Sequence, residues 1–201
     1  METGLVVVRP AVEADFDAWF AIFRAVAAEG RWIGRELPID KEEQRERFVA
    51  AFLDGDEPDQ LALALLAEVD GQAVGHLGLR SRRGLGDLGM AVLEGWRGRG
   101  VGAALMAAAV DWARVQGLHK VSLQLWPHNV AALRLYQKFG FQEEGRLVRQ
   151  YRRRNGELWD AIVMGLVLDT TSPSSPYAEP GGATSPGAEA SADSAAGSTD
   201  S

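Results

Sequence analysis

The sequence predicts an α/β fold in which strands alternate with helices. Short runs rich in Val, Leu and Ile alternate with longer stretches whose apolar residues recur at the helical spacing of three and four. The pairs Asp70-Gly71 and Asn155-Gly156 each lie between two strand-like runs and are typical of tight hairpin turns. Two pairs of neighbouring strands are therefore expected to be antiparallel.

The N-terminal half of the chain predicts three strands and two helices. Residues 5–9 form a short apolar, β-branched run that is typical of a buried strand. Residues 13–29 repeat large apolar side chains at helical spacing, and residues 41–53 do so with charges on the opposite side. Residues 61–69 and 73–79 flank the first hairpin turn, and we expect them to pair.

The C-terminal half continues the alternation of strands and helices. Residues 88–92 read as a strand, and residues 101–116 form an Ala-rich stretch with helical periodicity. Residues 121–125 predict a further strand, which a second short helix follows. Residues 141–151 and 158–168 flank the second turn and predict a final hairpin.

The junction between the strand at 88–92 and the helix at 101–116 contains three glycines at alternate positions, Gly98, Gly100 and Gly102. Glycine has no Cβ, so the backbone there can come close to a ligand. The start of the helix leaves several N–H groups unpaired and carries partial positive charge. The sequence therefore predicts a binding site for a phosphate or diphosphate group.

Two common phosphate-binding patterns do not fit this junction. A Walker loop requires Lys-Ser/Thr after the last glycine, where this chain has Ala103 and Ala104. A dinucleotide fingerprint requires an acidic residue at the end of the next strand, which here ends in Trp126-Pro127. Residues 97–102, R-G-R-G-V-G, match R/Q-x-x-G-x-G/A instead, and in this respect the chain resembles the GCN5-related N-acetyltransferases (GNAT), which bind the acyl-CoA diphosphate with that pattern.

A second segment strengthens the resemblance. Residues 129–141 are similar to the family's second cofactor segment, N-x-x-A-x-x-L-Y-x-K-x-G-F. A helix there would place Asn129 and Tyr136 on one face, two turns apart. Asn129 is a favourable N-cap and Gly140 a favourable residue after the C-cap, so the helix ends are marked independently of the family. The resemblance extends over residues 5–168.

The resemblance implies a particular sheet and a cofactor. In the family the sheet is mixed and mostly antiparallel, and it splays between its fourth and fifth strands, where the pantetheine arm of acetyl-CoA pairs with the exposed edge. The matching edge runs from Met90 to Val92. The cofactor contacts that the resemblance implies are Met90, Val92, Arg97, Gly98, Arg99, Gly100, Val101, Gly102, Ala103, Asn129 and Tyr136.

The expected chemistry is direct attack of a primary amine on the thioester of acetyl-CoA, because the chain has no cysteine to carry the acetyl group. An alkylammonium with a pKa near ~10 must first lose a proton. A backbone N–H near Val92 would stabilise the charge that develops on the thioester oxygen. The departing thiolate needs a proton, and the resemblance assigns that role to Tyr136.

Several residues are candidates for the general base. Asp87 stands at the start of the fourth strand, where many relatives have a glutamate, and it is one methylene shorter. Relatives that modify ribosomal protein N-termini have another glutamate at the position of Gln124, and an amide cannot act as a base. His76 is a candidate because of its ordinary pKa, although a lone histidine in a strand is more often structural. Glu36 either lines the acceptor site, where it would attract a cation, or is a solvated loop charge.

Four arginines gather before the second hairpin turn: Arg149, Arg152, Arg153 and Arg154. One possibility is that their charge attracts an acidic acceptor. We favour the other, in which they are solvent-exposed charges on an edge strand that prevent it from pairing with another chain. Three tryptophans either shape the acceptor pocket or pack in the core: Trp32, Trp126 and Trp159.

Composition divides the 201 residues into a domain, residues 1–169, and a tail, residues 170–201. The tail consists mainly of Ser, Pro, Ala, Gly and Thr, with four acidic residues and no Lys or Arg. It contains too little apolar surface to offset the entropy of ordering, and we predict that it is disordered.

Removal of the tail should therefore have little effect. We expect truncation after Asp169 to leave the melting temperature and the acetyl-CoA affinity nearly unchanged, because the tail contributes nothing to a core. Differential scanning calorimetry and isothermal titration calorimetry on the two lengths of chain would measure both. A large fall in either quantity would mean that the tail packs on the domain.

Other classes of protein fit less well. The absence of cysteine excludes disulfides and cysteine–metal sites, no metal is expected, and no apolar run approaches the length of a membrane span. The weakly acidic domain argues against nucleic acid as a partner, and without a signal peptide we expect a cytoplasmic protein.

The resemblance also bears on partners and on the alternative functions. Homodimers are frequent in the family, so a homodimer is possible for this chain. The main alternative to an acetyltransferase is a non-catalytic acyl-CoA-binding module, and a nicotinamide-dependent oxidoreductase is disfavoured by the glycine spacing.

Overall fold

The computed structural model describes residues 4–53, 59–169 and 171, and all of them belong to one compact unit. The predicted tail lies outside the described residues except for Thr171. The strands are β1 (Val6–Pro10), β2 (Gln60–Val69), β3 (Gln72–Arg82), β4 (Leu85–Val92), β5 (Lys120–Leu125), β6 (Gln142–Arg152) and β7 (Leu158–Val167). The helices are α1 (Phe16–Ala28), α2 (Lys41–Phe52), α3 (Val101–Val115) and α4 (Val130–Lys138), with 3-10 turns η1 (Glu13–Asp15) and η2 (Glu94–Trp96).

The predicted elements are all present, and the main differences lie at their ends. The segment predicted as one helix over residues 13–29 begins with the 3-10 turn η1. β3 and β4 are longer than predicted and meet at a turn in which Arg83 and Gly84 have φ values of 52° and 79°. The charged residues of that turn carry no hydrophobic periodicity, so the sequence pattern did not reveal it.

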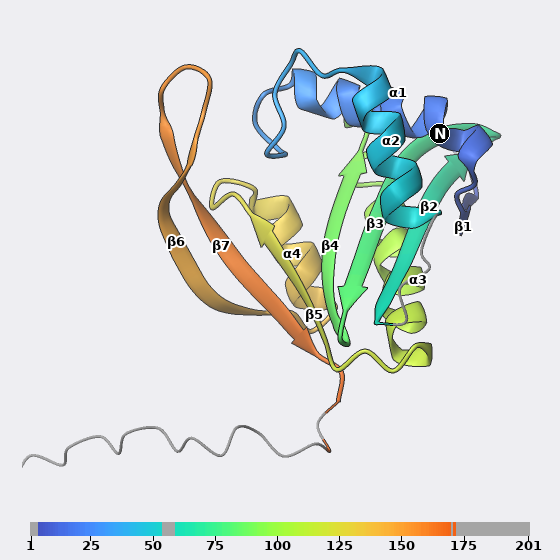
Figure 1. The fold of residues 1–201 in the computed structure, drawn as a ribbon, viewed down its shortest axis with the longest axis vertical. Coiled ribbons are helices and arrows are strands. Elements are labelled where there is room, and N and C mark those ends of the chain that lie inside the picture. The colour runs from blue at the N-terminus through green and yellow to red at the C-terminus, as the bar shows by residue number, and fades with distance from the viewer. Residues whose placement is uncertain (1–3, 54–58, 170, 172–201) are drawn as a thin grey trace, which may run out of the picture. The chain divides into compact units, whose positions relative to one another are not determined.

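The strands form one seven-stranded sheet in the order β1-β2-β3-β4-β5-β7-β6. All neighbours are antiparallel except β4 and β5, which are parallel (Figure 1). Both predicted hairpins are present, β2 with β3 and β6 with β7. The mixed, mostly antiparallel sheet with flanking helices is thereby confirmed.

The sheet splays between β4 and β5. Their ladder consists of three residue pairs and ends with Asp87 opposite Ser122. Beyond that pair the two strands diverge, so that residues 88–92 leave one edge of β4 without a neighbouring strand (Figure 1). It includes Met90 to Val92, the edge that the family resemblance implied.

Two apolar clusters cover the two faces of the sheet. On one face α3 and α4 contribute Leu105, Met106 and Tyr136 to a cluster with the strands. On the other face α1 and α2 contribute Phe16, Phe48 and further side chains to a second cluster. No described helix is long and apolar enough to cross a membrane.

Candidate active site

The glycine-rich junction forms a tight loop at the start of α3. Gly98 and Gly100 have φ values of 73° and 88°, a left-handed conformation that other residues seldom adopt. Gly100 is the N-cap of α3 and has no side chain to bond the first amides, so the N–H groups of Val101, Gly102 and Ala103 remain available. The loop therefore offers several convergent donors and the positive end of the helix to an anion.

Arg97 has a different environment from the one expected of a diphosphate ligand. Its guanidinium makes a two-pronged ion pair with Glu29 at the end of α1, with Nη1 2.7 Å from Oε2, and its Nε donates to the Val92 carbonyl at 2.9 Å. These hydrogen bonds hold the pKa of the Glu29 carboxyl below its usual range. Arg97 ties the loop to α1, whereas Arg99 is exposed and lies over Trp96.

The free edge of β4 presents backbone groups next to this loop. Leu93 donates to Val74 of β3, and because neighbouring residues of a strand point their N–H and C=O groups to opposite sides, Val92 and Met90 direct theirs away from β3. The bond from Arg97 to the Val92 carbonyl agrees with this direction. The Val92 N–H therefore faces the splay.

A cavity of about 550 Å³, here called the splay cavity, lies in this region. It is bordered by residues 88–92 of β4, by the glycine loop, and by Asn129 and Tyr136 of α4. All of the predicted cofactor residues except Arg99 and Val101 line it. The fold thus brings the two sequence motifs together around one space.

The helix that carries Tyr136 is capped as predicted. The Asn129 side chain accepts from the Ala132 N–H at 3.2 Å, and Gly140 after the C-cap has a φ of 91°. Tyr136 is 7% exposed and packs against Phe141, and among the described residues its hydroxyl has no hydrogen-bond partner. Burial raises the pKa of Tyr136 to about 12, so the phenol keeps its proton at neutral pH.

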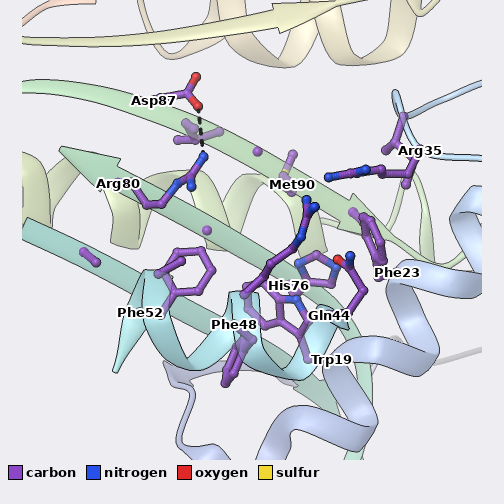
Figure 2. A pocket seen from close by; sticks show the side chains of 18 of the residues that line it. Trp19, Phe23, Arg35, Gln44, Phe48, Phe52, His76, Arg80, Asp87 and Met90 are labelled. Atoms are coloured by element: carbon purple, nitrogen blue, oxygen red, sulfur yellow. Dashed lines mark ion pairs between the residues drawn. The ribbon is translucent and has the colours of Figure 1, made fainter. Parts of the chain in front are cut away.

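A second cavity of about 940 Å³, here called the α1–α2 cavity, lies on the opposite face of β4. Aromatic side chains from α1 and α2 line it, among them Trp19, Phe23, Phe48 and Phe52 (Figure 2). Three arginines add positive charge: Arg35, Arg47 and Arg80. Residues 88–91 border both cavities, so the free part of β4 is common to the two.

The charged groups of the α1–α2 cavity differ in their pairing. Arg47 is paired with Glu43, and Arg80 lies 3.8 Å from Asp87 across the β3–β4 ladder. Arg35 has no ion pair or hydrogen bond with any described residue, and Figure 2 shows its side chain extending from the α1–α2 loop towards Met90. One cation is therefore available beside the free part of β4.

The candidate bases occupy very different surroundings. The Asp87 side chain is 72% exposed at the margin of the α1–α2 cavity, and it precedes Val92 by five residues. Five residues of a strand span about 16 Å, so a proton would travel from the splay to Asp87 through water.

His76 is buried beneath Trp19, with ring centroids 3.9 Å apart, and neither ring nitrogen has a hydrogen-bond partner in the described structure. Burial lowers the pKa of His76 to about 3, and a group with this pKa is a poor base for an alkylammonium. Glu36 lines neither cavity. Its carboxylate is partly exposed, pairs with Arg153 at 3.4 Å and accepts from the Arg154 N–H, so it is tied to the last hairpin.

The arginine cluster also needs correction. Arg152 and Arg154 are exposed, as a solvated hairpin requires, but Arg153 is 4% exposed and is bound by the α1–α2 loop. Trp32 and Trp126 line the splay cavity, whereas Trp159 packs against Arg153.

Sequence reasoning missed Tyr151 altogether. This β6 residue borders both cavities, and its hydroxyl donates to Gln124 at 2.7 Å. Nothing in the local pattern distinguishes it from the neighbouring residues of a half-exposed strand.

Comparison with known proteins gives a consistent result. Residues 20–141 match the model of the acetyltransferase (GNAT) family. The chain is 38% identical over 112 residues to the L-amino acid N-acetyltransferase AaaT of Escherichia coli K12, covering 51% of this chain and 67% of that protein. It is 26% identical over 170 residues to an L-methionine sulfoximine/L-methionine sulfone acetyltransferase of Pseudomonas paraeruginosa, covering 82% and 95%. A phosphinothricin acetyltransferase of Sinorhizobium meliloti in complex with acetyl-CoA superposes with a TM-score of 0.74 at 20% identity, covering 87% and 96%.

Proposed function

Because this chain belongs to the GNAT family of acetyltransferases, we propose that its acceptor is the α-amino group of a free amino acid or amino-acid analogue with an uncharged side chain. The protein is an N-acetyltransferase that uses acetyl-CoA as co-substrate. The single observation that carries the choice of acceptor is Arg35 in the aromatic α1–α2 cavity, where it has no ion pair with any residue that the structure describes.

The glycine loop supplies the binding site for the diphosphate of acetyl-CoA in this proposal. The N–H groups of Val101, Gly102 and Ala103 donate to its oxygens, and Arg99 adds charge from the exposed side of the loop. The free backbone groups of Met90 pair with an amide of the pantetheine arm. The Val92 carbonyl already accepts from Arg97, and the Val92 N–H is left for the acetyl group. Bound acetyl-CoA supplies an activated acetyl thioester between the two cavities.

Residues at the splay then assist three changes at the reacting atoms. The amine nitrogen forms a bond to the acetyl carbon, and the Val92 N–H stabilises the negative charge on the carbonyl oxygen. The C–S bond breaks, and Tyr136 donates its proton to the departing sulfur. The acceptor ammonium loses one proton, which passes through water to Asp87. The nitrogen loses a second proton as the amide forms, and this proton passes through water to Tyr136 and replaces the one given to the sulfur.

The shape and charge of the α1–α2 cavity support an amino-acid acceptor. Its aromatic wall suits an apolar or neutral side chain. A guanidinium binds a carboxylate through two parallel hydrogen bonds, and Arg35 extends towards Met90, so a bound carboxylate would bring the α-amine close to β4 (Figure 2). The named substrates of the two relatives, L-amino acids and methionine analogues, have this combination of groups.

We expect Arg35→Gln to raise the KM for an amino-acid acceptor by ~10- to 100-fold, since it removes a charge-assisted hydrogen bond to the carboxylate. Thiol release from acetyl-CoA, measured first across a panel of amino acids, amines and peptides, identifies the best acceptor. The same variant should have nearly the wild-type KM for the corresponding amine without a carboxylate, such as 3-methylthiopropylamine in place of methionine.

A suitable control is Arg24→Gln, which makes the same change at an exposed position of α1 outside both cavities. The role of Arg35 would be refuted if Arg35→Gln had the wild-type KM for the amino acid as well as for the amine without a carboxylate. Acetylation of peptides without any free amino acid would refute the proposed acceptor class.

A further inference from the structure

Two segments that are far apart in the sequence form a common wall for both cavities. Ile33 and Gly34 of the α1–α2 loop border the splay cavity and the α1–α2 cavity, and so does Tyr151 of the last hairpin. An acceptor in the α1–α2 cavity would lie beside this wall. The relative position of the loop and the hairpin therefore affects the space left for the acceptor.

Arg153 joins the two segments. It lies at the end of the hairpin strand that carries Tyr151, and its side chain is 3% exposed. Its Nη2 donates to the Gly30 carbonyl at 3.0 Å, and its Nη1 lies 3.4 Å from the carbonyls of Ile33 and Gly34. The loop is thus bound at three of its backbone carbonyls by one side chain.

The remaining surroundings of Arg153 compensate its charge. Glu36 lies 3.4 Å from Nη2, and the guanidinium carbon stands 4.4 Å from the ring centroid of Trp159 and 5.6 Å from that of Trp126. A buried cation is costly unless hydrogen bonds and opposite charge surround it, and this site supplies both. Such a complete set of partners indicates a fixed position for the side chain.

Only the planar fork of a guanidinium suits this set of partners. The carbonyls of three residues and one carboxylate surround a single guanidinium, which also stands over the rings of Trp159 and Trp126. The ammonium of a lysine presents its donors from a single point and cannot reach the same oxygens together. The geometry therefore requires arginine and not merely a positive charge.

The loop is also attached to the cofactor side of the molecule. Glu29, just before it, pairs with Arg97 of the glycine loop, and the Arg31 carbonyl lies 2.7 Å from Nε2 of His128. These contacts hold its first residues, whereas Arg153 holds the residues that border the cavities. Loss of Arg153 would therefore release the wall and leave the glycine loop anchored.

We propose that Arg153 is a positioning residue that fixes the α1–α2 loop against the last hairpin and thereby determines the affinity for the acceptor. It acts through Ile33, Gly34 and Tyr151 and touches no reacting atom. The inference rests on the proposed location of the acceptor in the α1–α2 cavity, but it does not depend on which amine is the substrate.

The test is the substitution Arg153→Ala, with Arg152→Ala as the matched control at the exposed neighbouring position. For the best acceptor found in the amine and peptide panel, we expect the KM to rise by ~10- to 100-fold while kcat at saturation and the acetyl-CoA affinity change by less than about threefold. Amide hydrogen exchange should become faster in residues 30–36 and stay unchanged in the glycine loop. Arg153→Lys should show the same defects, since the ammonium cannot replace the fork.

A second variant keeps the test independent of the folding of Arg153→Ala. Glu36→Gln retains the shape of the side chain and an oxygen that can accept from Arg154, but it removes the charge opposite Arg153. We expect a smaller rise of the acceptor KM, by about threefold to tenfold. An unchanged acceptor KM in these variants would overturn the proposal. So would an equal loss of acetyl-CoA affinity, which would indicate a general structural role. If only peptides are acetylated, the amino-acid proposal fails, but the KM comparison still decides the role of Arg153.

Discussion

Replacement of Tyr136 by phenylalanine is expected to lower kcat by ~10²- to 10⁴-fold with little change in acetyl-CoA affinity. Tyr136 borders the splay cavity, and no described residue hydrogen-bonds to its hydroxyl, so we propose that this hydroxyl serves the departing sulfur. Phenylalanine retains the ring that packs against Phe141 and removes only the proton donor. Steady-state kinetics and calorimetric titration of the same variant separate the two effects.

The pH profile gives an independent check. Because burial raises the pKa of Tyr136 to about 12, the folded protein keeps this phenol protonated throughout the neutral and mildly alkaline range. The wild-type kcat should therefore show no loss from ionisation of Tyr136 below about pH 11. A fall of kcat with an apparent pKa near ~10 that disappears in Tyr136→Phe would mean that the ring is not buried during turnover.

Tyr151→Phe is the matched control for this experiment. It removes a hydroxyl from the same cavity, but one that already donates to Gln124, and we expect kcat to change by less than about tenfold. Near-normal kcat in Tyr136→Phe would assign the proton transfer to water or to another group. Tyr136 would then be a packing residue.

Gly100→Asp is expected to weaken acetyl-CoA binding by about 100-fold. Gly100 is the N-cap of α3 with a φ of 88°, and no heavy atom lies within 4 Å of the position that a Cβ would occupy. The side chain therefore has room, and aspartate is one of the few residues that tolerate the left-handed conformation. Its charge would stand beside the proposed diphosphate site, where like charges a few ångströms apart repel by about 2–3 kcal/mol at the effective dielectric of a protein surface.

Gly100→Asn separates charge from shape. Asparagine has nearly the same size and the same tolerance for positive φ, so it carries the steric change without the repulsion. We expect its affinity to lie much closer to wild type, and the difference between the two variants to shrink as the salt concentration rises. Equal acetyl-CoA affinities for Gly100→Asp and Gly100→Asn by calorimetry would place the diphosphate elsewhere.

Much of the fold was accessible from the sequence because its determinants are local. Asp70-Gly71 adopts the left-handed turn that a tight hairpin requires, and Asn129 caps α4 through a bond to an amide three residues away. Strand ends were less well predicted, as in β3 and β4, because their last residues pair through backbone groups and do not depend on an apolar pattern.

The parts of the site that depend on local sequence could also be predicted. The glycine loop and the segment of Asn129 and Tyr136 each have a spacing that reports backbone geometry, and the fold places both around the splay cavity. Their roles in binding and catalysis stay predictions. The partner of Arg97 could not be predicted in this way. Its motif indicated a diphosphate ligand, whereas its guanidinium is bound to the carboxylate of Glu29, 68 residues away in the sequence.

The order of elements, the two hairpins and the loop at the start of α3 could be predicted, because turns, caps and periodicity depend on residues that are close along the chain. The surroundings of the charged and titratable side chains could not. His76 is a buried neutral ring, Arg153 is a buried link between two segments, and Arg35 is a cation without an ion pair among the described residues. The physical reason is that burial and pairing of a charge are set by segments that meet only when the chain has folded, such as the α1–α2 loop and the last hairpin.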